Sequence, residues 1–177
     1  MFRHKEKKHI IWDWNGTILN DVQHAVDTMN TILVESRLPT IDIHQYRKIF
    51  EFPVKNYYDK LGFDYSERSF EDLCHDFVNR FMDGFSGCSP FKQIEKAIVD
   101  TKSNGKTQSI LSASDQNSLN KMIDHFKFSE HFDFVYGIDD KLANSKISRG
   151  KSLLAQSQVS TKETVLIGDT LHDLEVA

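Results

Sequence analysis

The sequence predicts an α/β protein in which a doubly wound parallel sheet carries an inserted block of helices. Two observations support this fold class. Four short runs rich in β-branched and aromatic residues are typical of buried parallel strands, at residues 9–14, 106–114, 132–137 and 164–169. Helical patterns separate the last three runs, and strands that alternate with helices imply right-handed crossovers within one parallel sheet.

The first strand ends in a carboxylate. Residues 10–17 read IIWDWNGT, and Gly16 marks a sharp turn directly after the apolar run. Alternation places Trp12 and Trp14 on the same face, so Trp12 is expected to pack in the core under a helix. Trp14 lies inside the turn and is a candidate for facing the ligand crevice.

Residues 19–88 carry no strand pattern. Helices are predicted at 21–36, 43–50, 54–61 and 67–85, with Pro39, Pro53 and Gly62 at the turns. We therefore expect a core of residues 1–18 and 89–177, with residues 19–88 inserted as an all-helical cap. A cap inserted at the tip of the first strand would lie over the crevice as a lid.

The remaining elements follow the alternation of strand and helix. A helix over 89–105 leads into the second strand, and a helix over 148–158 precedes the fourth. The helix over 114–126 places apolar side chains on one face. These are Leu119, Met122, Ile123 and Phe126.

The last strand also ends in a carboxylate, since VLIGDTLHD spans residues 165–173. The carboxyl ends of parallel strands line the ligand crevice of open α/β sheets. We therefore expect Asp13 and Asp169 to meet in space although they are far apart in sequence. Two carboxylates at adjacent strand tips suit a hard divalent cation such as Mg²⁺.

The composition narrows the functional classes. The chain of 177 residues is 39% hydrophobic and has a net charge of −4, which gives no reason to expect a nucleic-acid partner. No run approaches the ~20 apolar residues that a membrane span needs. Cys74 and Cys88 form no ligand or redox spacing, which favours a reduced, cytoplasmic protein. The oligomeric state stays open.

Four motifs together resemble those of the haloacid-dehalogenase-like hydrolase superfamily. They are DWNGT at 13–17, ILSAS at 110–114, SKISRGK at 145–151 and GDTLHD at 168–173, in that order along the chain. The chain is similar to the phosphoglycolate-phosphatase-like branch, whose members carry an inserted helical cap.

The resemblance implies an Mg²⁺-dependent phosphatase that acts on a small phosphorylated metabolite. Asp13 would attack phosphorus and become an aspartyl phosphate, which splits phosphoryl transfer into two displacements. The metal would be held by Asp13, by the main-chain carbonyl of Asn15 and by Asp169. Asp173 would lie just outside, where it orients metal-bound water or the lysine.

The resemblance also implies a set of phosphate contacts. The hydroxyl of Ser112 and the main-chain N–H of Ala113 would donate to phosphoryl oxygens. Ser114 is the alternative to Ser112 at the end of this strand, but Ser112 directly follows the apolar residues 110–111 and is favoured, which leaves Ser114 to cap the following helix. Thr17 is a further candidate contact, although such a residue more often packs within the turn. Lys146 would place positive charge on the phosphate; Lys151 is the alternative.

One departure concerns Asn15, because most phosphatases of this superfamily carry Asp at that position as a general acid and base. An amide cannot exchange a proton at a useful pKa, and general acid–base catalysis typically contributes ~10²–10⁴-fold. A weakly active or non-catalytic phosphate-binding protein, or a slow phosphotransferase, is therefore the alternative function. His172 is a minor candidate as a substitute proton carrier and is more simply a partly exposed helix residue.

Two further expectations concern the edges of the molecule. The chain stops at Ala177, whereas the resemblance implies a further strand, so the C-terminal edge of the core is expected to be missing. In the cap, Arg47 and Lys55 flank the turn at Pro53 and are candidate contacts to an anionic substrate. The aromatic residues around them are expected to pack in the helical core.

Overall fold

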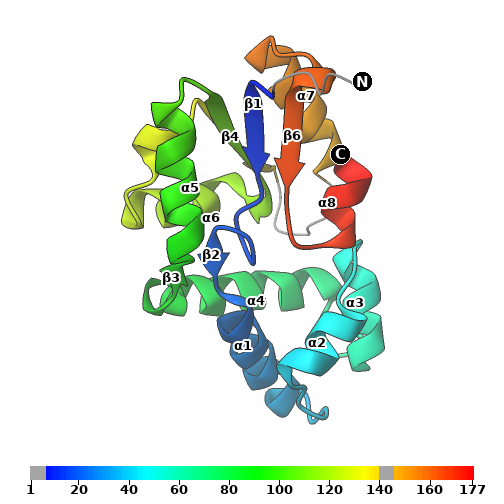
Figure 1. The fold of residues 1–177 in the computed structure, drawn as a ribbon. Helices are drawn as coiled ribbons and strands as arrows, with labels where there is room; N and C mark the ends of the chain where they lie inside the picture. Colours follow the sequence, from blue (N-terminus) through cyan, green and yellow to red (C-terminus); the bar gives the residue numbers. More distant parts are fainter. Residues whose placement is uncertain (1–6, 140–145) are drawn as a thin grey trace.

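The structure, a computed structural model, describes residues 7–139 and 146–177. Its sheet has four parallel strands in the order β5-β4-β1-β6 (Figure 1). The strands are β1 His9–Trp12, β4 Thr107–Asp115, β5 Phe134–Ile138 and β6 Thr164–Ile167. All four predicted strands are confirmed, with ends that differ by two residues at most.

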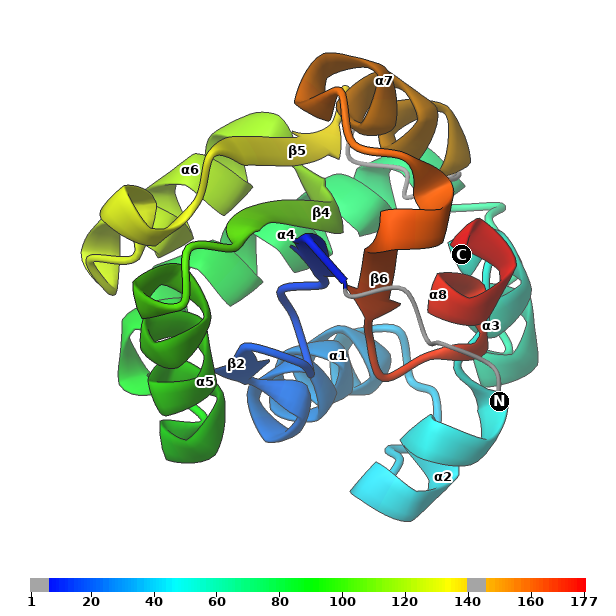
Figure 2. The same ribbon diagram turned by 45° about the horizontal axis from the view of Figure 1, so that its top comes forward.

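Helices cover both faces of this sheet, which confirms the doubly wound arrangement (Figure 2). The core helices are α5 Lys92–Ser103, α6 Gln116–His125, α7 Ile147–Ser157 and α8 Leu171–Val176. Short 3₁₀ turns lie at Phe85–Gly87, Ser129–His131 and Thr161–Glu163. In the described part of the chain β6 forms one edge of the sheet, with no strand beyond it.

The alternation of side chains along the strands explains why both faces are covered. Trp12 and Ile110 point to the face where α6 supplies Leu119. The neighbouring residues Ile11 and Leu111 point to the opposite face, where α7 supplies Leu153. Because successive strand residues face opposite sides, both sides of β1 and β4 are apolar and each needs its own layer of helices.

Trp14 lies on the same face as Trp12 but does not reach the crevice. Its side chain is fully buried, and its ring packs edge-on against Phe128 at 5.9 Å between centroids. Phe126 lies on another side of the indole, 6.4 Å away. The suggestion that Trp14 faces the ligand is therefore wrong, because the turn after β1 directs the indole into the core.

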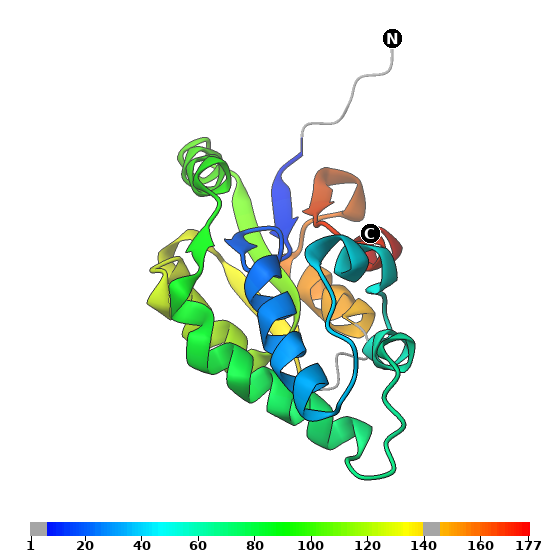
Figure 3. The ribbon, with the colours of Figure 1, turned by 90° about the horizontal axis from the view of Figure 1, so that it is seen from below.

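Four helices follow the first strand: α1 Val22–Glu35, α2 Ile43–Ile49, α3 Val54–Leu61 and α4 Phe70–Gly84. They lie beyond the carboxyl ends of the strands, as seen from the side in Figure 1 and from below in Figure 3. They share a second apolar cluster, made by Met29, Ile32, Leu33, Tyr57, Tyr58, Leu61, Leu73 and Cys74. The fourth begins at residue 70 rather than 67, because Ser69 accepts the N–H of Asp72 as its N-cap.

A two-stranded antiparallel ribbon stands where the chain enters and leaves this helical block. It pairs β2 Leu19–Asn20 with β3 Ser89–Pro90. The sequence predicted no strand there, since two residues are too few to produce a periodic pattern. The ribbon coincides with the expected boundaries at residues 19 and 89, which supports our proposal of a separate core and cap. None of the described helices is long and apolar enough to cross a membrane.

The central strand β4 offers a test of the core. Ile110 is fully buried, and we expect Ile110→Ala to lower the free energy of unfolding by about 2–5 kcal/mol, because the lost methyl groups leave a cavity. The measurement is urea denaturation followed by circular dichroism. Val34→Ala is the matched control: its side chain is 63% exposed, and the change should stay within about 0.5 kcal/mol. Equal effects of the two changes would contradict this packing.

Candidate active site

Three aspartates meet at the carboxyl edge of the sheet. Strands β1 and β6 pair in register at Trp12 and Ile167, and the N–H of Asp13 donates to the carbonyl of Ile167 at 2.8 Å. Asp13 and Asp169 therefore emerge from the same edge, as the sequence predicted. Asp173, in the first turn of α8, joins them, and one oxygen from each of the three carboxylates lies within 4.8 Å of the others.

Lys146 is the cation of this cluster. It is buried at the start of α7, and its Nζ lies 2.7 Å from Oδ1 of Asp13 and in contact with Oδ1 of Asp173. It also donates to the carbonyl of Leu111 at 3.3 Å. Lys151, the alternative, is exposed on α7. The structure therefore brings Lys146, and not Lys151, to the acidic residues.

The three carboxylates experience different electrostatic environments. Burial raises the pKa of Asp13 to about 7, although the charge of Lys146 opposes the rise. Burial and the charge of Asp173 also raise the pKa of Asp169. Burial acts in the same direction on Asp173, but Lys146 and the hydrogen bonds from Thr170 outweigh it and hold that pKa below its usual range. One ammonium is thus shared by carboxylates whose combined negative charge exceeds it.

This donor set suits a divalent cation. Carboxylate oxygens are the ligands that Mg²⁺ prefers. A dication would also offset the negative charge by which the three carboxylates exceed the one ammonium. The turn after β1 approaches the site closely. At Gly16, with φ of +75°, a Cβ would lie 2.4 Å from a carboxylate oxygen of Asp169, so only glycine fits.

Thr17 follows in the same turn and is buried. Its hydroxyl donates to Oδ1 of Asp169 at 3.3 Å, and it does not line the cavity described below. The structure thus places Thr17 against a carboxylate and outside the space for substrate.

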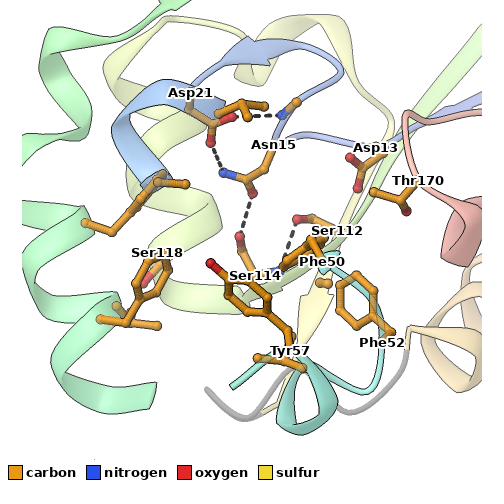
Figure 4. Close-up of a pocket in the computed structure, with 18 of the residues that line it drawn as sticks. Asp13, Asn15, Asp21, Phe50, Phe52, Tyr57, Ser112, Ser114, Ser118 and Thr170 are labelled. Carbon is orange, nitrogen blue, oxygen red and sulfur yellow. Dashed lines mark hydrogen bonds between the residues drawn. The ribbon is translucent and has the colours of Figure 1, made fainter. Parts of the chain in front are cut away.

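Asn15 is fixed from two sides by hydrogen bonds (Figure 4). Its Nδ2 donates to Asp21, and its Oδ1 accepts the hydroxyl of Ser114 at 2.7 Å. The other oxygen of Asp21 accepts the N–H of Gly16 at 2.8 Å. Burial raises the pKa of Asp21 to about 6, although the hydrogen bonds from Asn15 and Gly16 oppose the rise.

The sequence missed the contribution of Asp21 and misassigned Ser114. An aspartate before a helix is typical of an N-cap, yet the side chain of Asp21 makes no capping bond and turns to Asn15 instead. Ser114 does not cap α6, because Asp115 does so by accepting the N–H of Ser118. No local pattern distinguishes these roles, since both depend on how β1 and β4 lie side by side.

A cavity of about 200 Å³ opens beside the acidic cluster, between the sheet edge and the helical block (Figure 4). Ser112 and Ala113, predicted as phosphate contacts, both line it, together with Asp13, Asn15 and Lys146. The opposite wall comes from α1 to α4 and the turn at Pro53. The structure thus gathers the predicted phosphate and metal contacts around one space, with the exception of Thr17.

The residues predicted to bind an anion from the cap do not reach this space. Arg47 and Lys55 are exposed and absent from the lining. Lys55 pairs with Asp59 at 2.9 Å and lies over the ring of Tyr65. The prediction fails because both side chains lie on the outer surface of their helices, and aromatic residues of the same turn face the cavity.

His172 also differs from expectation, because it is buried rather than partly exposed. The ring of Phe52, from the turn before α3, stacks on the imidazole with 4.4 Å between centroids. The expected exposure ignored this covering residue, which comes from the distant helical block. Phe52 thereby joins the helical block to the first turn of α8.

The fold and the site define a protein of the α/β class, with a parallel sheet covered by helices and an acidic centre at the carboxyl edge of that sheet. The family model described as haloacid dehalogenase-like hydrolase matches residues 10–177. The chain therefore belongs to the haloacid dehalogenase-like hydrolase family. No match was found among the curated proteins.

Solved structures share this fold at low sequence identity. A haloacid dehalogenase-like hydrolase from Streptococcus pneumoniae is 17% identical with a TM-score of 0.80, covering 96% of this chain and 79% of its own. A predicted phosphoglycolate phosphatase from Haemophilus somnus is 15% identical with a TM-score of 0.73, covering 96% and 80%. CbbY from Rhodobacter sphaeroides, solved in complex with phosphate, is 14% identical with a TM-score of 0.73, covering 96% and 81%.

Replacing the central cation tests this arrangement. We expect Lys146→Met to lower the free energy of unfolding by about 3–5 kcal/mol in buffer with EDTA, because Asp13 and Asp173 lose their buried partner. Lys151→Met, five residues along the same helix, is exposed and should change stability by less than about 0.5 kcal/mol. Urea denaturation at pH 8 measures both. A Lys146→Met protein as stable as the wild type would contradict the shared ion pair.

Proposed function

We propose that the chain is an Mg²⁺-dependent phosphatase that hydrolyses a small phosphorylated metabolite through an aspartyl phosphate on Asp13. The observation that carries this proposal is the position of Asp13, which lies in the wall of a cavity beside Asp169, Asp173 and Lys146. Membership of a hydrolase family and the phosphatases among the proteins of similar fold support it.

In the first step a carboxylate oxygen of Asp13 forms a bond to phosphorus while the bond from phosphorus to the substrate alcohol breaks. In the second step water attacks the same phosphorus, which releases inorganic phosphate and regenerates the carboxylate. A carboxylate nucleophile divides the transfer in this way when neighbouring groups hold the phosphoryl oxygens. Ser112, Ala113 and Lys146 would fill that role, and their position in the lining of the cavity beside Asp13 supports it.

The residues present fit a resident Mg²⁺ ion. Asp13, Asp169 and the main-chain carbonyl of Asn15 would hold it, and Asp173 would orient its surroundings through Lys146. When bound, the ion supplies positive charge that offsets the charge of the phosphoryl oxygens. The free thiols of Cys74 and Cys88 support a reducing, cytoplasmic location.

Asn15 affects the expected rate of hydrolysis, whereas the attack of Asp13 on phosphorus does not require it. An amide cannot donate a proton to the leaving alcohol or accept one from the incoming water at a useful pKa, and here it is fixed between Asp21 and Ser114. This observation favours a second candidate function, in which the aspartyl phosphate persists and the protein acts as a slow phosphotransferase. A weakly active phosphate- and Mg²⁺-binding protein is the limiting case.

Phosphate release tests the leading proposal. With p-nitrophenyl phosphate we expect release that requires Mg²⁺ and that Asp13→Asn reduces by about 10³-fold or more, because the nucleophile is lost. Asp100→Asn makes the same chemical change on the exposed surface of α5 and should leave the rate unaltered. Metal-independent release, or full activity in Asp13→Asn, would contradict the proposal. Enzyme that becomes phosphorylated but releases no inorganic phosphate would favour the slow phosphotransferase.

The hydrogen bonds of Asn15 lead to a paired substitution. Asn15→Asp alone sets a second carboxylate against Asp21, and the repulsion should raise the pKa of both groups. Asn15→Asp together with Asp21→Asn restores an amide–carboxylate hydrogen bond with the acid at position 15. We expect this double variant to release phosphate about tenfold faster or more than the wild type, since general acid–base catalysis is regained.

The measurement is single-turnover breakdown of the phosphoryl-enzyme, with Asp21→Asn alone as the control. Because that control lacks the acid at position 15, it should be no faster than the wild type. A double variant that is no faster than this control would show that proton transfer at position 15 does not limit turnover.

A further inference from the structure

The cavity beside Asp13 has two walls of opposite chemistry. The sheet edge supplies carboxylates and serine hydroxyls, whereas the helical block supplies apolar and aromatic side chains. Those of the helical block include Met29, Phe50, Phe52, Val54, Phe77 and Val78. In Figure 4 the aromatic side chains of Phe50, Phe52 and Tyr57 lie on one side of the space, and Asp13, Asn15 and Asp21 lie on the other.

The charges around this space are strongly unbalanced. Of the described residues that line it, Lys146 is the only lysine or arginine, and it is already engaged by two carboxylates. Five aspartates line the same cavity: Asp13, Asp21, Asp115, Asp169 and Asp173. A second anionic group on a bound ester would therefore meet no uncommitted lysine or arginine among the described lining residues, and burying such a group unpaired is costly.

The apolar wall is a fixed surface. The ring of Phe52 stacks on His172, and it meets Phe50 edge-on at 5.5 Å between centroids. Phe50 in turn contacts Tyr57 at 5.2 Å. This row of rings runs from the helical block to the residue next to Asp173, so it borders the space that the alcohol part of an ester at Asp13 would occupy.

Three tyrosines of the helical block, Tyr46, Tyr57 and Tyr58, also line this wall, and one of their hydroxyls lacks a hydrogen-bond partner among the described residues. The hydroxyl of Tyr57 is buried and has no hydrogen-bond partner among the described residues. A buried hydroxyl without a partner is unfavourable, and a neutral polar atom of a ligand would satisfy it. The wall is thus built for an uncharged group that carries at most a little polarity.

We propose that the apolar wall selects phosphate monoesters whose alcohol part is uncharged and largely apolar, such as one aromatic ring or a short aliphatic chain. Esters that carry a second anion, such as phosphoglycolate, are disfavoured. This inference rests on the proposed function, since it names the substrate class of the same site. The cavity volume of about 200 Å³ restricts the alcohol part to a small group.

A matched pair of esters tests the selection. The probes are 4-methylphenyl phosphate and 4-carboxyphenyl phosphate, assayed with Mg²⁺ and the whole chain. The carboxylated phenol is the better leaving group, so chemistry alone would favour it. We expect kcat/KM to be higher for the methyl ester by about tenfold or more, because the carboxylate would be buried unpaired. Propyl phosphate and 2-phosphoglycolate form the corresponding aliphatic pair.

A substitution in the wall should reverse the preference. Val78 is half-buried on α4 and lines the cavity. Val78→Lys adds one cation, and we expect it to shift the ratio of kcat/KM toward the carboxylated ester by about tenfold, the scale of one charge-assisted hydrogen bond. Val78→Met introduces an unbranched side chain similar in length to lysine but without the charge. It should leave the ratio of kcat/KM for the two esters as it is in the wild type.

The outcomes separate this inference from the proposed function. Mg²⁺-dependent turnover of both esters without preference for the methyl ester would overturn the selection and leave the phosphatase intact. If neither ester is hydrolysed, calorimetry with Asp13→Asn decides: tighter binding of the methyl ester supports the selection although the phosphatase fails. Equal or weaker binding of the methyl ester overturns the selection as well.

Discussion

The rest of the site depends on one interaction, in which the buried carboxylates of Asp13 and Asp173 share the ammonium of Lys146 while the exposed carboxylate of Asp169 lies beside them. Buried carboxylates are unfavourable unless they are paired, and Lys146 contacts both Asp13 and Asp173. Asp173 also accepts the N–H of Thr170 at 3.0 Å, which fixes the first turn of α8. The chain can pass this close because residue 168 is glycine, where a Cβ would lie 2.2 Å from the carboxyl carbon of Asp173.

The turn after β1 connects this centre to the helical block. Asp21 stands directly before α1, and it binds both the amide of Asn15 and the N–H of Gly16. Asn15 in turn accepts a hydrogen bond from Ser114 on β4. The point where the chain enters the helices is therefore tied to the residues that surround Asp13. Any shift of α1 against the sheet would strain this chain of hydrogen bonds.

The two halves of the molecule contribute different chemistry to one cavity. The carboxyl edge of the sheet concentrates charge, because strand tips place polar residues from distant parts of the sequence side by side. The helices place their apolar faces inward to form a cluster of their own, and several of the same side chains also line the cavity. A site with a charged end and an apolar end follows from this division. Because the helical block supplies one wall of the cavity, the fold of the sheet alone does not specify a substrate.

The sequence by itself determined the strands, most helices and the meeting of Asp13 with Asp169, because apolar runs and the rule of strand tips are local or topological properties. The choice of Lys146 over Lys151, the turn of Asp21 toward Asn15 and the aromatic wall with Phe52 on His172 were decided only by the tertiary structure. Each of these depends on which side chains from separate segments come within contact. Sequence periodicity describes the faces of one segment, and it carries no information about the partner that covers each face.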